Sequence, residues 1–274
     1  LGCARDDGQP ATLHAGPGLR PGMLIRLFCS LAVALSFVPV ARAADDVRPL
    51  LDKMHDAGDG LVSLTSGLKM IDFDFDTSDE VWRFGKLNLL RGDDGDAIHV
   101  LFTRRADPDG NAAEEKLEYL LAEGQLVDRN YRSKTEVRRT LPEEDQDRDL
   151  LALGEGPFPL PIGQDPERVL RLFEVSLVDV ASDNEFEVDP IDGTRRLRLV
   201  PRPETPLAEQ FHVLEVDVDT TTGMARQVTT LDAGGINLRI VELRNAAVNA
   251  NDAAEPTLEA VDLSDWNVTE ERME

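Results

Sequence analysis

Four strand-length segments follow one another between residues 81 and 141: VWRFGKLNLLR (81–91), AIHVLFTR (97–104), KLEYLLA (116–122) and LVDRNYRSKTEVRRTL (126–141). Turn-forming residues separate them at 92–95 (GDDG), 107–111 (DPDGN) and 123–125 (EGQ). Apolar and polar residues mostly alternate in the second and third segments, and alternate side chains of a strand point to opposite faces of the sheet. The pattern predicts one large, curved antiparallel sheet with an apolar face.

The start of the chain resembles an export signal. Met23 and Arg26 precede an apolar run at 27–40 and a small-residue cleavage site, Ala41-Arg42-Ala43. The run is too short to span a membrane. We therefore expect an upstream leader and signal peptide over residues 1–43, a single domain over 44–274, and a periplasmic location. The alternative for residues 1–22 is a buried N-terminal helix.

The composition excludes several classes of function. The net charge of −24 repels phosphate backbones, so nucleic acid is not an expected partner. Both cysteines precede residue 44, and the four histidines form no metal-binding motif. Nucleophile-elbow, P-loop and dinucleotide-binding motifs are absent. We expect no catalytic activity, no cofactor and no metal. The alternating Asp72, Asp74 and Asp76 are interpreted as the solvated side of a strand.

Helix signals lie on either side of the sheet pattern. Asp45 and Asp46 can cap a helix with apolar residues at 47, 50, 51 and 54. A second helix is expected to begin at Asp165-Pro166-Glu167. Between the sheet segments and this helix, 142–156 is acidic and predicts a helix and loop, followed by an apolar, proline-stiffened loop at 156–161. Further strands are predicted at 61–76, near 185, and at 194–200, 210–218, 224–231 and 237–243.

Several of these segments resemble motifs of the LolA family, the periplasmic carriers of outer-membrane lipoproteins. Residues 85–91 (GKLNLLR) resemble its G-x-L-x-x-x-R strand, and 121–126 (LAEGQL) with Tyr131 resemble its D-G-x-x-L hairpin. Residues 196–202 (RLRLVPR) resemble its L-x-L-x-P-K strand, and 213–249 resemble its closing pair of strands. The chain departs from the family at Gly92, where the family has proline, at Glu123, and in its C-terminal residues.

The resemblance implies a mainly β (α+β) fold, an unclosed, strongly curved half-barrel with a helical lid. It also implies a hydrophobic cavity for acyl chains. The alternative for each candidate lining residue is an ordinary core side chain. These candidates are Phe73, Phe75, Trp82, Phe84, Leu87, Leu89, Val100, Phe102 and Tyr119 from the sheet, and Leu160, Leu170 and Phe173 from the lid.

Arg91 matches the family arginine that lies beneath the lid and can hydrogen-bond to backbone carbonyls of the lid helices. A guanidinium suits this role because it presents five donors in a rigid fork. The resemblance therefore implies that Arg91 is a latch of the lid. The alternative is a solvent-facing arginine beside Asp93, Asp94 and Asp96.

Two functions remain open at this stage. The first is a monomeric carrier that takes an acylated lipoprotein or lipid from an inner-membrane donor complex to an outer-membrane acceptor. The second is a lipoprotein- or peptide-sensing module on the same scaffold, acting in envelope stress or assembly. A carrier needs an apolar cavity, because burying each methylene contributes about 0.8 kcal/mol.

Overall fold

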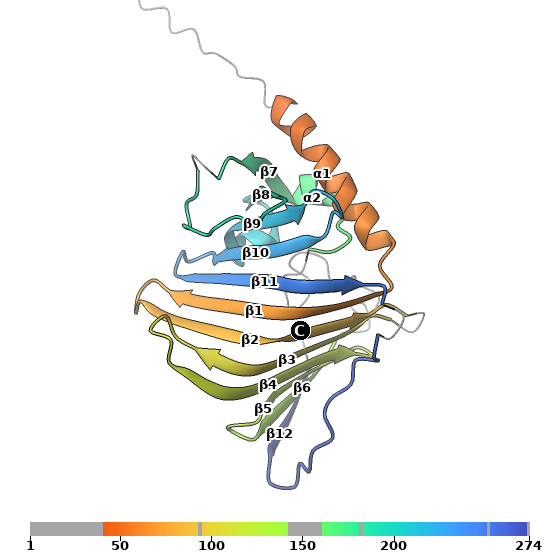
Figure 1. Ribbon diagram of the computed structural model, residues 1–274, viewed down its shortest axis with the longest axis vertical. Helices are drawn as coiled ribbons and strands as arrows, with labels where there is room; N and C mark the ends of the chain where they lie inside the picture. The colour runs from red at the N-terminus through yellow and green to blue at the C-terminus, as the bar shows by residue number, and fades with distance from the viewer. Residues whose placement is uncertain (1–40, 93–94, 142–160, 181–182, 251–252, 273–274) are drawn as a thin grey trace, which may run out of the picture. The chain divides into compact units, whose positions relative to one another are not determined.

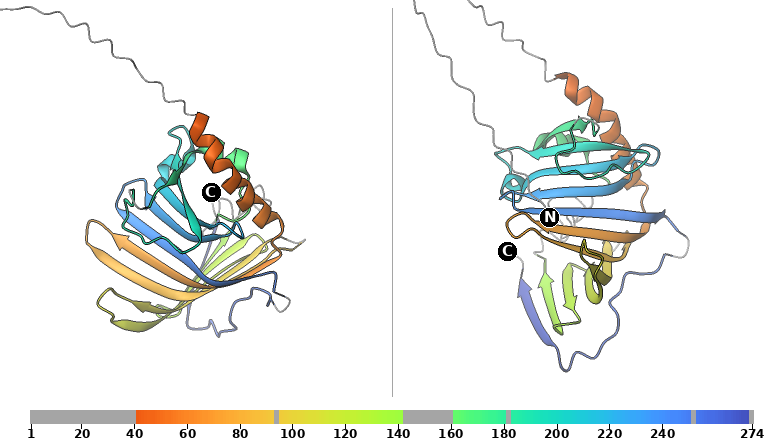
Figure 2. Two further views of the ribbon diagram at one scale, coloured as in Figure 1. Left: turned by 45° about the horizontal axis from the view of Figure 1, so that its top comes forward. Right: turned by 60° about the vertical axis from the view of Figure 1, so that its left-hand side comes forward.

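The computed structural model describes residues 41–92, 95–141, 161–180, 183–250 and 253–272, with side chains described from Val47 onward. Most of the predicted leader and signal peptide, and most of the expected acidic helix and stiff loop at 142–161, lie outside these residues. Within the described part, twelve strands form one sheet in the order β12-β6-β5-β4-β3-β2-β1-β11-β10-β9-β8-β7 (Figure 1). Figure 2 shows the sheet bending between its two edges without closing.

The strands of the first half are β1 (Ser63–Asp74), β2 (Asp79–Leu90), β3 (Ala97–Ala106), β4 (Ala112–Ala122), β5 (Gln125–Asn130) and β6 (Thr135–Thr140). Those of the second half are β7 (Phe173–Val178), β8 (Thr194–Pro201), β9 (Phe211–Asp219), β10 (Ala225–Asp232), β11 (Asn237–Val248) and β12 (Asn267–Arg272). The helices are α1 (Ala41–Asp59), α2 (Pro166–Leu172) and the short 3-10 helix η2 (Pro206–Glu209). No helix of the described residues is long and apolar enough to cross a membrane.

The expected fold class is confirmed: a mainly β chain with an unclosed sheet and helices on one face. The helix predicted around Val47 and Met54 is α1, and both side chains are buried. Asp165 caps α2 as expected, because its carboxylate accepts a hydrogen bond from the Glu167 N–H. The predicted turns at 107–111 and 123–124 join consecutive antiparallel strands.

Two strand predictions are wrong. Residues 126–141 form the separate strands β5 and β6, because the Asn130 side chain accepts hydrogen bonds from the N–H groups of Arg132 and Ser133 and starts a turn. The turn ends at Lys134, which has a φ of 52°. The region near residue 185 is not a strand but an irregular segment, in which Glu187 also has a positive φ of 52°.

Strands β7 and β12 are not predicted by the sequence pattern. Phe173 is expected to continue the second helix, yet it starts β7. In β12 the only apolar residue is Val268, and the whole strand is exposed, so no alternating pattern marks it. It pairs in parallel with β6 and forms one edge of the sheet.

The structure explains why position 85, in the GKLNLLR segment that resembles the family motif, is a glycine. The register between β2 and β3 shifts at Phe84 and Gly85, and the backbones approach closely there. A Cβ on Gly85 would lie 2.1 Å from the carbonyl oxygen of Leu101. Only glycine fits this close approach without moving the neighbouring strand.

The sheet has two distinct faces, and the helices pack against only one of them. On this helix-covered face, Leu87 lies opposite Val100, and Leu89 lies opposite Ile98. The same face continues through Val241 of β11 to Val228 of β10. We call the other side the loop-covered face, because residues 183–191 and 253–266 lie against it.

Candidate ligand-binding site

The helix-covered face carries two adjoining apolar clusters. One spans β1 to β5 with part of β11 and Met224 before β10, and includes Leu64, Leu87 and Phe102. Leu141 and Ile162, which flank the segment 142–160 outside the described residues, also belong to it. The other joins α1 and α2 to β7–β10, where Leu51 and Met54 of α1 pack with Leu214 and Val216 of β9. The two clusters meet where Val241 of β11 lies opposite Val228 of β10, and the described helices pack mainly on the second cluster.

The C-terminal end of α1 is held to the sheet by Arg91, the residue after β2. Its Nη1 donates a hydrogen bond to the carbonyl oxygen of Gly58, at 3.1 Å, and its Nε lies 3.6 Å from a carboxylate oxygen of Asp96. Carbonyls in the last turn of a helix lack intrahelical partners, so a cationic donor is well placed there. The family resemblance implies a latch at this position, and the latching role of Arg91 stays a prediction; of the acidic residues in the alternative, Asp96 is in contact with Arg91, while Asp93 and Asp94 lie outside the described residues.

A backbone contact between two glycines adjoins this hydrogen bond. A Cβ built on Gly58 would lie 1.9 Å from the Cα of Gly163, in the segment that leads into α2. The Arg91 Nη2 is 3.6 Å from the position that a Gly163 Cβ would take. The end of α1, the 161–164 segment and Arg91 therefore form one tight junction at the edge of the helix-covered face.

The predicted lining residues do not share one face of the sheet. Five of them lie on the helix-covered face, namely Leu87, Leu89, Val100, Phe102 and Tyr119, and Leu170 and Phe173 pack in the adjoining cluster on that face. Four lie on the loop-covered face, namely Phe73, Phe75, Trp82 and Phe84. Leu160 lies outside the described residues. The residues on opposite faces cannot contact the same ligand.

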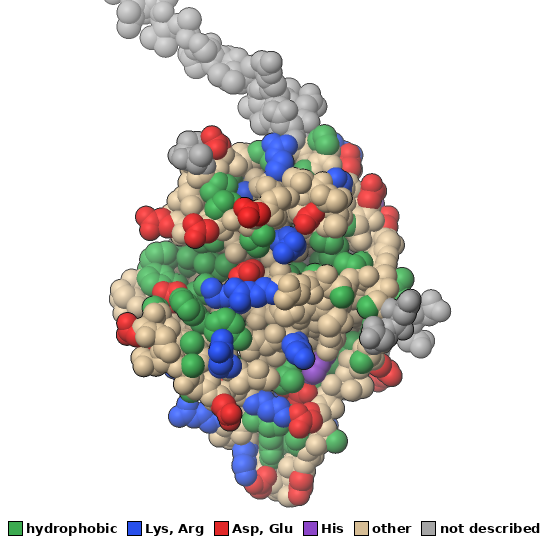
Figure 3. All heavy atoms as spheres, viewed as in Figure 1, with side chains coloured by type: hydrophobic (Ala, Val, Ile, Leu, Met, Phe, Trp, Pro, Cys, Tyr) green, Lys and Arg blue, Asp and Glu red, His purple; other side chains and the backbone are tan. Residues whose placement is uncertain are grey.

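A pocket of about 750 Å³ lies on the loop-covered face. Its floor is formed by β1 and β11, and its wall by the 183–191 segment, which connects β7 to β8. Figure 3 shows apolar side chains gathered on the left of the view, where strands β1 and β10 end and β11 begins. The main apolar lining residues are Ile71, Phe73, Phe75, Phe186, Leu238 and Ile240.

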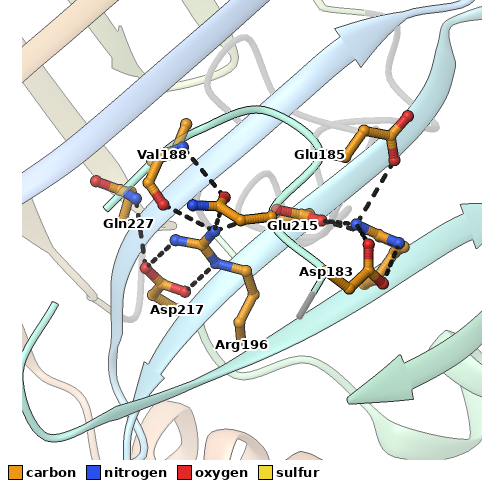
Figure 4. Close-up of polar contacts among 9 residues, drawn as sticks. Asp183, Glu185, Val188, Arg196, Glu215, Asp217 and Gln227 are labelled. Atoms are coloured by element: carbon orange, nitrogen blue, oxygen red, sulfur yellow. Dashed lines mark hydrogen bonds and ion pairs between the residues drawn. The ribbon is translucent and has the colours of Figure 1, made fainter. Parts of the chain in front are cut away.

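The wall of this pocket rests on a buried ion network. Arg196 of β8 donates to both carboxylate oxygens of Asp217, at 2.6 and 2.9 Å, and Gln227 also donates to Asp217 (Figure 4). The Nη1 of Arg196 reaches the 183–191 segment, where it donates hydrogen bonds to the carbonyl of Val188 at 3.1 Å and to the Asn184 side chain at 3.4 Å. The segment is therefore fixed by a charged group that the sheet supplies.

A second carboxylate, Glu215, completes the network. Burial raises the pKa of Glu215, and the neighbouring Arg198 and Arg196 oppose this shift. Conversely, the hydrogen bonds to Asp217 raise the pKa of Arg196. Arg198 extends the network to the surface, where it pairs with Asp183 at 2.8 Å. These contacts stabilise the position of the 183–191 segment.

Another polar cluster on the loop-covered face binds the segment before β12. Burial alone would raise the pKa of Glu118, but hydrogen bonds from His99, Tyr131 and the Glu259 N–H lower it to about 2. Arg129 donates to the Glu259 carbonyl at 2.7 Å. Glu118 and Arg129 thus bind the backbone N–H and the carbonyl of Glu259, which makes this cluster structural. Within the described residues, no group of His, Cys, Asp or Glu side chains is placed to hold a metal ion.

No protein-family model matches the sequence, and no curated protein is similar to it in sequence. Among solved structures, an uncharacterized conserved protein from Thermus thermophilus is similar, with 11% identity over 82% of this chain and 99% of that chain, at a TM-score of 0.44. MucB in its complex with MucA from Pseudomonas aeruginosa has 15% identity over 75% of this chain and 58% of that chain, at 0.38. A LolA superfamily protein from Nitrosomonas europaea has 9% identity over 74% and 94%, at 0.30. LolA-superfamily proteins are thus among its structural neighbours.

The pocket wall and the ion network were not predicted from the sequence. The sequence does contain a signal for the ion network, because charged and apolar residues alternate in two segments. These are Arg196 to Leu199, and Leu214 to Val218 with Glu215 and Asp217. This alternation places the charged residues together on one face. It does not reveal that a distant segment covers them.

Proposed function

We propose that this protein is a non-catalytic carrier that binds the acyl chains of lipoproteins or lipids against the helix-covered face. It moves them through the periplasm toward the outer membrane. The observation that supports the proposal is the pair of adjoining apolar clusters on one face of the sheet, beside a helix whose last turn is held by Arg91 at Gly58. A cover of this kind can close over the apolar surface when no cargo is bound.

The energetics support a covered apolar site. A sixteen-carbon chain gains roughly 10 kcal/mol or more on leaving water, at about 0.8 kcal/mol per methylene. A carrier must offer comparable apolar surface, and the two clusters on the helix-covered face provide it from residues such as Leu89, Val100 and Leu214. In the closed state, α1 side chains such as Leu51 and Met54 occupy the part of this surface formed by β7–β10. Acyl chains replace them when the helix moves outward.

Individual polar contacts hold the cover, helix α1, to the sheet. Besides Arg91, the Lys53 side chain donates a hydrogen bond to the carbonyl of Thr220 at the end of β9. Each such contact contributes only about 1–3 kcal/mol, less than the gain from burying one long acyl chain. Cargo binding can therefore offset the loss of these polar contacts.

Together with the predicted export signal, the proposal implies that the donor and acceptor of this cargo lie at the two membranes of the envelope. The partners of the proposed carrier are an inner-membrane complex that releases acylated cargo and an outer-membrane acceptor. The carrier works as a monomer.

A binding or sensing module on the same scaffold is the second candidate. The observation that favours it is the pocket on the loop-covered face, which a carrier that uses only the helix-covered face does not need. Such a module would recognise a lipoprotein or peptide and act in envelope stress or assembly.

Native mass spectrometry of the protein purified from its own periplasm tests the carrier. We expect a fraction of the protein to carry the added mass of a lipid or an acylated polypeptide. Protein without adducts in every preparation, combined with no binding of added fatty acid, would overturn the proposal.

Replacing Arg91 tests the role of the cover. The substitution Arg91→Leu removes the hydrogen bond to Gly58 and makes the open state less costly, so a fluorescent fatty acid should bind about tenfold more tightly. Arg105→Leu is the matched control, because Arg105 lies exposed on the neighbouring strand β3. Equal affinities for both variants and the wild type would show that Arg91 does not restrain the cover.

A further inference from the structure

The pocket on the loop-covered face combines an apolar floor with an acidic rim. Its volume of about 750 Å³ is in the range of small-molecule sites. The rings of Phe73 and Phe75 meet edge to face, with centroids 4.9 Å apart, and Phe75 is 49% exposed. Leu238 and Phe73 also belong to a small apolar cluster that includes Phe186 of the wall. An apolar group entering here would cover aromatic surface that now faces water.

The rim carries an excess of negative charge. Five carboxylates line the pocket, from Glu80, Glu185, Glu187, Asp189 and Glu242, against a single ammonium group, from Lys69. That ammonium group lies 4.7 Å from the ring centre of Trp82.

Three of the five rim carboxylates have partners within the protein. Glu80 accepts a hydrogen bond from the Trp82 indole, Glu242 pairs with Arg244, and Glu185 lies 3.5 Å from Arg198. Glu187 and Asp189 are exposed and take part in no ion pair found among the described residues. Their charge is therefore available to a ligand.

The pocket is formed before any ligand arrives. Arg196 fixes the wall through Val188 and Asn184, and it is itself held by the buried Asp217 (Figure 4). Because the wall is already anchored, ligand binding does not carry the entropy cost of ordering it. Low-dielectric walls also focus the field of the rim carboxylates into the pocket.

We infer that this pocket binds an organic cation that carries an apolar body. The apolar body packs against Ile71, Phe75 and Ile240, while the cationic group lies at the rim near Glu187 and Asp189. Exposed aromatic rings at the same place also attract cations. This activity is distinct from the proposed carriage of acyl chains, because it uses the opposite face of the sheet and selects for positive charge.

Isothermal titration with three twelve-carbon amphiphiles, each below its micelle concentration, tests the inference. The probes are dodecyltrimethylammonium, dodecyl sulfate and a neutral dodecyl glycoside. We expect the cation to bind at least tenfold more tightly than either of the others. Equal affinity for the three headgroups would overturn the inference.

Charge-neutralising variants localise the site and separate it from the overall negative charge. Glu187→Gln combined with Asp189→Asn should weaken binding of the cation about five- to tenfold and leave binding of the neutral probe unchanged. The matched control is Glu204→Gln with Glu209→Gln, two exposed acids that do not line the pocket. An equal loss in both double variants would assign the preference to long-range charge and contradict the proposed site.

Two further variants connect this test to the carrier proposal. Phe75→Ala should weaken binding of the cation, because it removes part of the apolar lining of the pocket. Arg91→Leu should leave the ratio between the affinities for the cation and the neutral glycoside unchanged, since Arg91 lies at the helix-covered face. A cation preference that follows Arg91 and ignores Phe75 would move the ligand to the helix-covered face and overturn the inference, whatever the outcome for the carrier.

Discussion

At the scale of single residues, the most constrained groups are charged side chains buried on the loop-covered face. Arg196, Glu215 and Asp217 are 2% exposed or less, as is Glu118 in the second cluster. Charges taken out of water are tolerated only when they are paired and hydrogen-bonded. These residues therefore determine how residues 183–191 and 253–266 attach to the sheet.

Removing Arg196 should be strongly destabilising. Arg196→Leu leaves Asp217 and Glu215 with too few partners, and we expect the free energy of unfolding to fall by about 3–5 kcal/mol. Urea denaturation measures the loss. Arg244→Leu removes an exposed arginine paired with Glu242 and should cost about 1 kcal/mol or less. Similar losses in the two variants would contradict the assigned importance of burial.

Glu118 should make stability depend on pH in the acidic range. Its pKa is lowered from 4.5 to about 2 in the folded state, so its contribution is complete above pH 4.5 and disappears as the pH falls toward 2. The contribution at neutral pH is roughly 3 kcal/mol. The stability difference between wild type and Glu118→Gln should shrink by about half between pH 5 and pH 3. A difference that stays constant across this range would exclude the ionised carboxylate as its source.

At the scale of elements, α1 is attached to the rest of the protein by an apolar face and by separate contacts at its C-terminal end. Leu50, Leu51 and Met54 attach it to the β7–β10 part of the sheet, while Arg91 and the contact between Gly58 and Gly163 hold its last turn. The burial of the apolar residues gives the helix most of its stability, and the junction at Gly58 controls whether it stays closed.

A methyl group on Gly58 should open this junction. In Gly58→Ala the new Cβ would overlap the Gly163 backbone, so the helix end and the 161–164 segment must separate. We expect faster amide hydrogen exchange over residues 50–59 and greater binding of an apolar dye. Gly60→Ala is the control, because its Cβ would meet nothing closer than 3.7 Å. Unchanged exchange in Gly58→Ala would show that the junction does not restrain α1.

At the scale of the whole sheet, the two edges are β7 and β12. An edge strand exposes unpaired backbone groups that can recruit another chain. Strand β12 covers β6, and ion pairs such as Arg139 with Glu271 hold it in place. The strand buries no apolar side chain, so its main effect is to occupy the edge.

Deleting residues 267–274 should therefore promote self-association. The deletion bares the backbone of β6, and we expect oligomers in sedimentation velocity experiments at concentrations where the full chain is monomeric. Lys134→Ala, which removes only the ion pair to Asp265, should remain monomeric. A monomeric deletion variant would mean that β6 is protected by other features.

Much of the sheet follows from local patterns. Strands β2, β3 and β4 and their turns could be predicted because alternation and turn residues act over a few positions. The limits of prediction appear at Asn130, where a side chain bonded to the backbone divides the segment 126–141 that is predicted as one strand, and in β12, where no pattern exists. For the candidate site, the position of Arg91 beside the helical cover could be inferred by resemblance, whereas the twelve lining residues could not be assigned to one cavity.

The sequence by itself determined which side chains share a face of each strand, because the period of two is a local property of the extended backbone. Only the tertiary structure decided which face the helices cover. Phe73 and Leu87 are equally apolar in the sequence, but the pairing of β1 with β2 and β11 directs Phe73 toward the 183–191 segment and Leu87 toward the helix-covered cluster. That choice depends on contacts between residues far apart in the chain, which no local pattern contains.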